Sequence, residues 1–229
     1  MQCGHCVAIC PRNAVELAGS DPNEIVPLKE LDLAIDPDVF LNHLRSRRSI
    51  RSFKKTPVDR EVMERLLDAG RFSPTGGNRQ DVAYHVFLDT VPDLRDRIIA
   101  ELKSMGEAEL VAGAPSSWYP EFWVNTAKEY EETGRDSIFF DAPAVIVVSS
   151  DVPQAACIAS AHMETLANAL GLGVLYSGFS VRAIGHSSDL QSYVGLKEGY
   201  SAWCVLVLGY PEVRYQRTVS CNVADAIWN

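Results

Sequence analysis

The sequence has no uncharged apolar run long enough to cross a bilayer, and it does not begin with the basic and apolar segments of a secretory signal. Residues 165–181 lack charge, but they contain Asn168 and several glycines, so we interpret them as a buried helix followed by a strand. These absences argue against the membrane-spanning and secreted classes. They predict a cytoplasmic protein with no membrane partner.

Acidic residues are missing from one segment of a chain that is otherwise acidic. The protein has 30 Asp and Glu against 21 Lys and Arg, yet residues 39–58 contain no acid and residues 45–55 hold six of the basic side chains. Arginine grips phosphate well because its planar guanidinium offers paired N–H donors and keeps its charge. The segment therefore predicts a phosphate site, with a solvated charge run as the alternative. The net charge of −9 argues against a nucleic-acid partner.

Cysteine is too scarce for a disulfide scaffold, with six in 229 residues, but three crowd into the first ten. Cys3, Cys6 and Cys10 have the spacing C-x2-C-x3-C-P, which resembles the last three-quarters of the C-x2-C-x2-C-x3-C-P run of bacterial ferredoxins. The resemblance predicts ligands of a 4Fe-4S cluster whose first cysteine would stand immediately before Met1, so we expect the upstream codon to encode Cys. A zinc site that includes His5 and a reduced, metal-free tail are the alternatives.

An acidic stretch follows the cysteines and separates two parts of the chain. Residues 16–36 have six acidic side chains and one basic one, which is typical of a linker with little regular structure. Asp36 followed by Pro37 is a good helix start. We therefore predict a partial ferredoxin-like segment with its linker over residues 1–36 and a second domain over 37–229.

Hydrophobic periodicity predicts helices and strands in the second domain. The helix that begins at Pro37 has an apolar face of Phe40, Leu41 and Leu44, and it ends in the arginine-rich segment. Glu164 is interpreted as a satisfied interior or interface group. The other expected elements are a helix over 59–69 that Gly70 stops, a strand over 82–87, a helix over 92–105, a strand over 144–149, a buried helix over 153–170, and strands over 174–179 and 203–208.

Several spaced motifs resemble the FMN-dependent nitroreductase family. The first two are the Arg-Arg-Ser-x-Arg-x-Phe segment from Arg47 and the Ser-Pro-Thr-Gly-Gly-Asn-x-Gln loop from Ser73, which leads into a strand. Three more follow in the family's order: Asp-Ala-Pro-Ala-Val-Ile-Val-Val from Asp141, Ala-Leu-Gly-Leu-Gly from Ala169 and Leu-Gly-Tyr-Pro from Leu208. The resemblance covers about residues 40–217, and with the cysteines it points to the subgroup with an N-terminal ferredoxin-like iron–sulfur segment. It implies an α+β fold, an α/β/α sandwich with a central, mostly antiparallel sheet, in an intertwined homodimer with FMN at its interface.

The resemblance also assigns roles to residues of this chain. Arg47, Arg48 and Ser49 would hold the phosphate and ribityl chain, and Arg51 would place positive charge near flavin N1 and O2. No side chain is assigned a catalytic role, because the chemistry takes place on the flavin. The chain departs from the family at residues 218–222, which lack an expected basic pair. The remaining cofactor-binding residues are Pro74, Asn78 and Gln80 of the loop, with Asn78 on the pyrimidine edge, the backbone N–H groups of Ser177 and Gly178 near flavin N5, and Arg217.

The implied function is ping-pong reduction of a small organic acceptor, such as a nitroaromatic compound or a quinone, with NAD(P)H or a ferredoxin-type protein as electron donor. The first alternative is a non-catalytic FMN and iron–sulfur module that relays electrons to a partner protein. A homodimer that has lost its flavin is a further alternative. The aromatic side chains between residues 106 and 137 either cover the substrate face of the flavin or belong to the core or a dimer contact.

Overall fold

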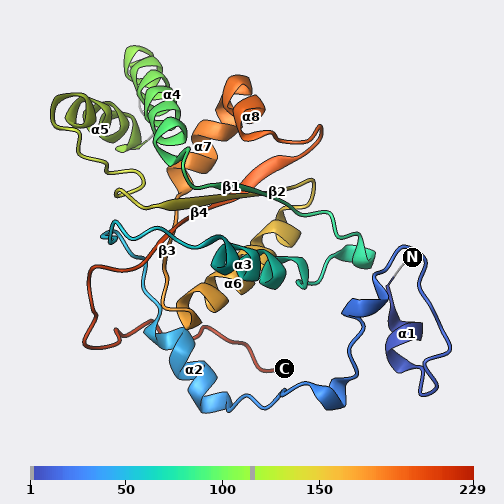
Figure 1. Ribbon diagram of the computed structural model, residues 1–229. Coiled ribbons are helices and arrows are strands. Elements are labelled where there is room, and N and C mark those ends of the chain that lie inside the picture. The colour runs from blue at the N-terminus through green and yellow to red at the C-terminus, as the bar shows by residue number, and fades with distance from the viewer. Residues whose placement is uncertain (1–2, 114–116) are drawn as a thin grey trace.

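The computed structural model describes residues 3–113 and 117–229 and places a four-stranded sheet between two layers of helices (Figure 1). The strand order is β1-β2-β4-β3, and every neighbouring pair is antiparallel. The predicted α+β class and antiparallel sheet are confirmed, whereas the intertwined dimer stays a prediction. The strands are β1 (Ala83–Phe87), β2 (Ala144–Ser150), β3 (Gly173–Tyr176) and β4 (Ser201–Gly209).

The two faces of the sheet carry separate parts of the core, because side chains alternate along each strand. On β2, Val145 and Val147 pack into one part while Ala144, Ile146 and Val148 pack into the other. All seven residues of β2 are buried. A strand covered on both sides needs no polar positions, which explains its continuous β-branched run.

Helices cover both faces of the sheet (Figure 1). One face is covered by α4 (Val91–Val111), α5 (Tyr119–Thr133), α7 (Gly178–His186) and α8 (Ser188–Val194), and the other by α3 (Arg60–Arg71) and α6 (Pro153–Ala169). The packed stripe of α6 includes Ala156, Met163 and Ala167. Its opposite side, with Cys157 and Ile158, is exposed, so α6 is only half covered by its own chain.

The N-terminal part runs along the outside of the molecule through α1 (His5–Ile9), two short turns, η1 (Pro22–Glu24) and η2 (Leu28–Glu30), and α2 (Pro37–Ser46). The Asp36 carboxylate caps α2 as predicted, accepting hydrogen bonds of 2.9 Å from the N–H groups of Asp38 and Val39. The apolar face of α2 is present but uncovered, since Phe40 and Leu44 are 42% and 44% exposed.

The arginine-rich segment leaves α2 and lies along β3, the edge strand of the sheet. Ser49 forms a parallel bridge with Val174, and the N–H of Ile50 donates to the Val174 carbonyl at 3.1 Å. Close packing requires glycine at Gly173, where a Cβ atom would lie 2.4 Å from Ile50. The sheet edge therefore fixes the backbone from which the predicted phosphate ligands project.

The structure corrects three predicted element ends. Gly70 does not stop α3, which continues to Arg71; it is a helix residue whose missing Cβ leaves room for the Tyr84 ring. Helix α4 continues beyond the predicted residue 105 to Val111. The strand expected over 174–179 ends at Tyr176, and Gly178 instead opens α7.

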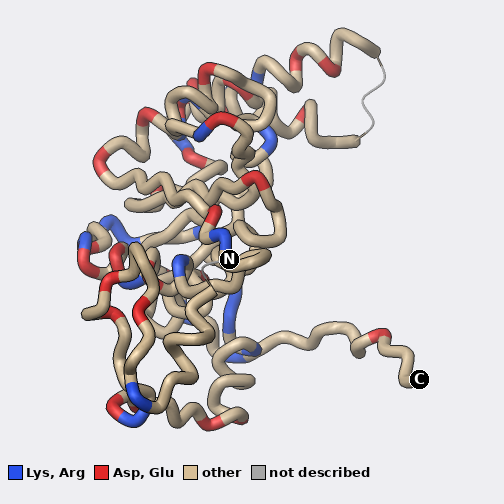
Figure 2. Tube along the Cα trace, turned by 90° about the vertical axis from the view of Figure 1, so that its right-hand side faces the viewer, with Lys and Arg blue, Asp and Glu red and all other residues tan. Residues whose placement is uncertain are grey.

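The C-terminal tail beyond β4 has no helix or strand and reaches past the body of the molecule (Figure 2). Its apolar side chains are uncovered, with Val223 94% and Trp228 93% exposed. Elsewhere in the described ranges, no helix has the length and apolar composition needed to cross a bilayer.

Candidate functional site

A cavity of about 290 Å³ lies between the end of β3, the start of α7 and helix α5; we call it the aromatic cavity. Its lining includes two guanidinium groups, those of Arg51 and Arg182, and no Asp or Glu among the described residues. This is a local concentration of positive charge in an acidic protein. Its aromatic lining consists of Tyr119, Phe122, Phe140, Tyr176 and Phe179.

A buried carboxylate shapes one wall of the aromatic cavity. Asp136 accepts hydrogen bonds from the N–H groups of Ile138 at 2.9 Å, Phe139 at 2.8 Å and Asp141 at 3.1 Å. These bonds hold Phe140 and Asp141 in left-handed conformations, with φ of 56° and 55°. The loop thereby turns the Phe140 side chain to the cavity.

The start of α7 forms the floor of the cavity and contains the two predicted backbone donors. The N–H of Ser177 already donates to the Val205 carbonyl at 2.8 Å. The N–H of Gly178 belongs to the first turn of the helix, where it has no acceptor within α7. The positive end of the helix dipole favours negative charge at this point. Of the two donors, Gly178 is therefore the one available to a ligand.

One of the predicted phosphate ligands, Arg47, forms an ion pair with a carboxylate of the same chain. Arg47 Nη1 lies 3.1 Å from Glu164 Oε1 on α6, and the Glu164 side chain is only 12% exposed. Burial and then the nearby Glu164 carboxylate raise the pKa of Tyr176, which lies beside this pair. Across the described residues, Arg48 and Arg51 make no ion pair. Glu164 thus positions Arg47, while Arg48 and Arg51 are open to an anion.

A second cavity, of about 560 Å³, contains the other predicted set, Pro74, Asn78 and Gln80. The loop is folded on Thr75, whose carbonyl accepts from Asn78 N–H and whose hydroxyl accepts from Gln80 N–H, both at 3.0 Å. Asn78 and Gln80 both have positive φ, which suits this tight fold. The N-terminal segment closes the cavity, since residues 17–21 line it as well.

The two predicted sets lie at opposite edges of the sheet. The aromatic cavity borders β3, whereas the second cavity borders Tyr84 of β1. Strands β2 and β4 separate these edges. Arg51, Ser177 and Gly178 line the aromatic cavity, whereas Pro74, Asn78 and Gln80 line the second one. Arg47, Arg48 and Ser49 line neither cavity.

Residues 44–210 match the family model described as "Nitroreductase family". The chain belongs to the nitroreductase family. The arginine-rich segment, the loop from Ser73 and the residues that line the aromatic cavity all lie within the matched range.

Solved nitroreductases share the fold. An FMN-bound nitroreductase from Bacteroides fragilis aligns with a TM-score of 0.63 and 16% identity, over 82% of this chain and 98% of its own. One from Desulfitobacterium hafniense, also with bound FMN, gives 0.61 and 23% over 83% and 97%. An FMN-dependent nitroreductase from Clostridium difficile gives 0.61 and 20% over 83% and 100%. No curated protein sequence matches this nitroreductase-family chain.

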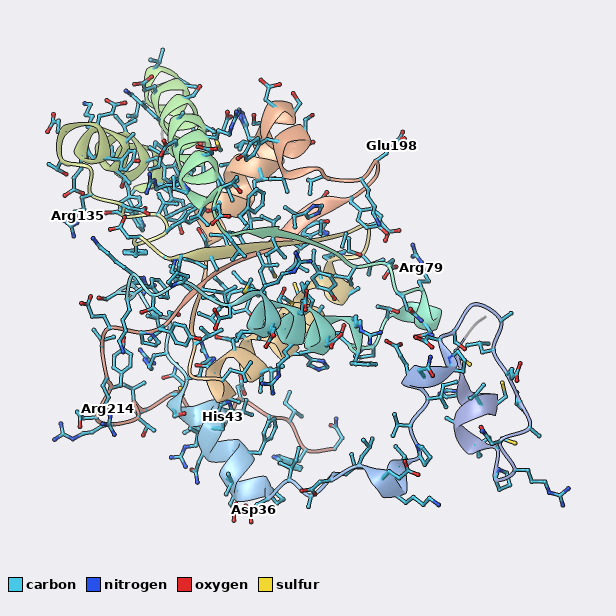
Figure 3. All side chains as sticks on the ribbon, viewed as in Figure 1. Asp36, His43, Arg79, Arg135, Glu198 and Arg214 are labelled. Carbon is cyan, nitrogen blue, oxygen red and sulfur yellow. The ribbon has the colours of Figure 1, made fainter. Side chains whose placement is uncertain are left out.

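The remaining predicted site residues lie outside both cavities. Arg217 is in the exposed C-terminal tail, and its neighbour Arg214 points away from the body of the molecule (Figure 3). The thiols of Cys3, Cys6 and Cys10 are free, and across residues 3–113 and 117–229 no group of three potential ligands is arranged to hold a metal ion. The geometry therefore does not support the iron–sulfur assignment.

Sequence reasoning does not identify two residues that shape this site: Asp136, which holds the loop behind the cavity wall, and Arg182, which lines the cavity. Asp136 gives no local signal beyond a polar residue before a turn. Arg182 follows Gly178 by four positions, which places both on one side of a helix. The sequence pattern hides this relation because it predicts one strand over residues 174–179, where the structure has the end of β3 and the start of α7.

Proposed function

We propose that this member of the nitroreductase family is an FMN-dependent oxidoreductase that reduces a small organic acceptor, nitroaromatic or quinone, with NAD(P)H or a ferredoxin-type donor. The observation that carries the proposal is the aromatic cavity, which combines planar apolar walls, the Gly178 N–H and Arg51, with no carboxylate among its described lining residues. FMN bound in the Bacteroides and Desulfitobacterium family members supports the same cofactor.

The residues of this chain would act by binding and orientation. Arg48 and Ser49, with Arg47 held by Glu164, would grip the FMN phosphate and ribityl chain. Arg51 and Gly178 would meet the ring from the cavity side, where both offer donors to developing negative charge. Bound FMN would supply the electron transfer between donor and acceptor. The aromatic walls would exclude water from the ring.

A second copy of the chain would complete the site. The loop residues Pro74, Asn78 and Gln80 are at the far sheet edge, so a homodimer that brings one chain's loop to its partner's aromatic cavity would unite the two sets. The uncovered faces of α2 and α6 and the apolar tail supply surface for such an assembly. The C-terminal residues, including Arg217, would then lie against the other subunit.

The N-terminal segment would bring an electron donor to this assembly if it carries a cluster. Glu24 anchors it to α3 through two bonds to Arg71, of 2.5 and 3.1 Å. This contact places the segment beside the predicted FMN loop (Figure 1). Iron and sulfide analysis of anaerobically purified protein, with and without the upstream codon, tests this part of the proposal.

Absorbance spectroscopy of the purified protein tests the main proposal. We expect a flavin band near ~450 nm that bleaches when NAD(P)H or reduced ferredoxin is added under nitrogen and returns with a quinone. A colourless protein that takes up no FMN on reconstitution would refute the proposal. Bound flavin that no donor and acceptor pair turns over would favour the electron-relay alternative.

A further inference from the structure

Arg182 lies at the wall of the aromatic cavity, which offers it no acidic partner among the described lining residues. Other arginines of the chain, such as Arg71 and Arg79, are paired with carboxylates. Arg182 makes no ion pair within the described residues, and its interaction is a cation–π contact with Cζ 5.3 Å from the Tyr119 ring centroid. A guanidinium held against a ring keeps its N–H edge free to bind an anion.

The surrounding rings define the rest of the ligand. Phe179 contacts Tyr119 and Phe122, with ring centroids 5.4 and 5.3 Å apart, so α5 and α7 present one continuous aromatic wall. The described lining contains no Asp or Glu that could pair with Arg182 or repel a negative ligand. A planar apolar body with one anionic substituent matches both features.

The two cationic side chains of the aromatic cavity come from different elements of the fold. Arg51 comes from the segment along β3, which is assigned to the flavin under the proposed function. Arg182 projects from α7 one turn after Gly178, toward Tyr119 of α5. We propose that Arg182 determines specificity for aromatic acceptors that carry a carboxylate or a comparable oxyanion. This inference rests on the proposed function, because it assigns the acceptor of the same site.

Two acceptors of nearly equal shape test the charge requirement. Wild-type protein is expected to reduce 4-nitrobenzoate with a higher kcat/KM than 4-nitrobenzamide. Arg182→Gln is expected to lower kcat/KM for 4-nitrobenzoate by about tenfold or more, the effect of one charge-assisted hydrogen bond. It should leave the value for 4-nitrobenzamide and the FMN content unchanged. Arg182→Lys should restore part of the preference.

Arg97→Gln is the matched control. Arg97 makes a similar cation–π contact, with Cζ 4.2 Å from the Tyr193 ring centroid, but it does not line the aromatic cavity. Its replacement should leave kcat/KM unchanged for both acceptors. Thermal melting of both variants shows whether any loss comes from unfolding.

Calorimetric titration of the purified, oxidised protein with the same two compounds gives a readout that needs no turnover. Tighter binding of 4-nitrobenzoate that Arg182→Gln abolishes supports the inference, even if neither compound is reduced and the proposed function fails. Reduction of both compounds without a charge preference overturns the inference and leaves the proposed function standing. A preference that survives Arg182→Gln, or the absence of any binding, also overturns it.

Discussion

Arg47 shows that a side chain assigned to a ligand by a sequence motif can form an ion pair within the folded chain instead. Its partner Glu164 is 117 positions away in the chain, so no local pattern could reveal the pair. The motif predicts that arginines gather here, and the fold decides which of their donors remain open. Substituting Arg47 would also leave a buried carboxylate unpaired, which lowers stability as well as ligand affinity.

Arg48 offers a cleaner test of the phosphate clamp, since it makes no ion pair with the described residues. Arg48→Ala is expected to weaken FMN binding by about 10- to 100-fold, the effect of losing a charge-assisted hydrogen bond. Flavin fluorescence during titration of apo-protein measures this. Lys54→Ala and Lys55→Ala are the controls, because they remove equal charge from the solvated end of the segment. Equal losses of FMN affinity in all three variants would mean that the total positive charge of the segment, and not a specific contact from Arg48, determines FMN binding.

Cys204 is expected to remain a neutral thiol well above neutral pH. Burial, the main cause, raises its pKa to about 11, and Cys157 lies with its Sγ 3.9 Å away. Since the folded-state pKa exceeds the ordinary value of 9.0, the contribution of the Cys204 thiol to folding stability is complete below pH 9. This contribution is lost as pH rises toward 11. Mass spectrometry after iodoacetamide treatment at pH 8.5 should find Cys204 unmodified in folded protein and modified in urea. Rapid labelling in the folded state would contradict this.

At the scale of elements, sequence periodicity predicts the type of most helices and strands but fails at glycines. Because glycine commonly ends helices, the pattern predicts that Gly70 stops the helix, whereas in the structure Gly70 makes room for Tyr84. The pattern likewise predicts that Gly178 belongs to a strand, whereas in the structure Gly178 is the first residue of α7. A glycine signals close approach or unusual backbone, and only the neighbouring element shows which applies.

Gly173 tests the seating of the arginine-rich segment. Gly173→Ala places a methyl group against Ile50 and is expected to lower the free energy of unfolding by about 1–3 kcal/mol, with a parallel loss of FMN affinity. Urea denaturation followed by circular dichroism measures the change. Gly185→Ala is the matched control: a Cβ there meets nothing within 4 Å in α7, so stability should stay or rise by up to about 1 kcal/mol. Coincident curves for wild type and Gly173→Ala would refute this seating.

At the scale of the whole molecule, the sequence predicts which surfaces are apolar but not what covers them. An apolar stripe has the same period whether its partner belongs to the same chain or to another. The stripe of α3 is buried within the chain, whereas that of α2 has no buried residue. The motifs likewise name two sets of ligands without showing that β2 and β4 separate them.

The uncovered apolar face of α2 leads to a prediction about the oligomeric state. Light scattering should give the wild type twice the chain mass of 25.2 kDa. Phe40→Asp should raise the dimer dissociation constant by at least about tenfold and release FMN, because a charge would enter an apolar contact. Val111→Asp is the control, since Val111 is 87% exposed at the far end of α4. A wild-type monomer that retains FMN would contradict the two-chain site.

Under the proposed function, the bridge between Ser49 and Val174 would connect the supply of FMN to the solubility of the chain. Strand β3 is an edge, and an uncovered edge offers its N–H and C=O groups to strands of other molecules. The segment that covers this edge is the one proposed to hold the FMN phosphate, so bound flavin would keep it in place. Cells short of flavin would then accumulate chains with an open edge, and aggregation, rather than inactive soluble protein, would be the visible outcome.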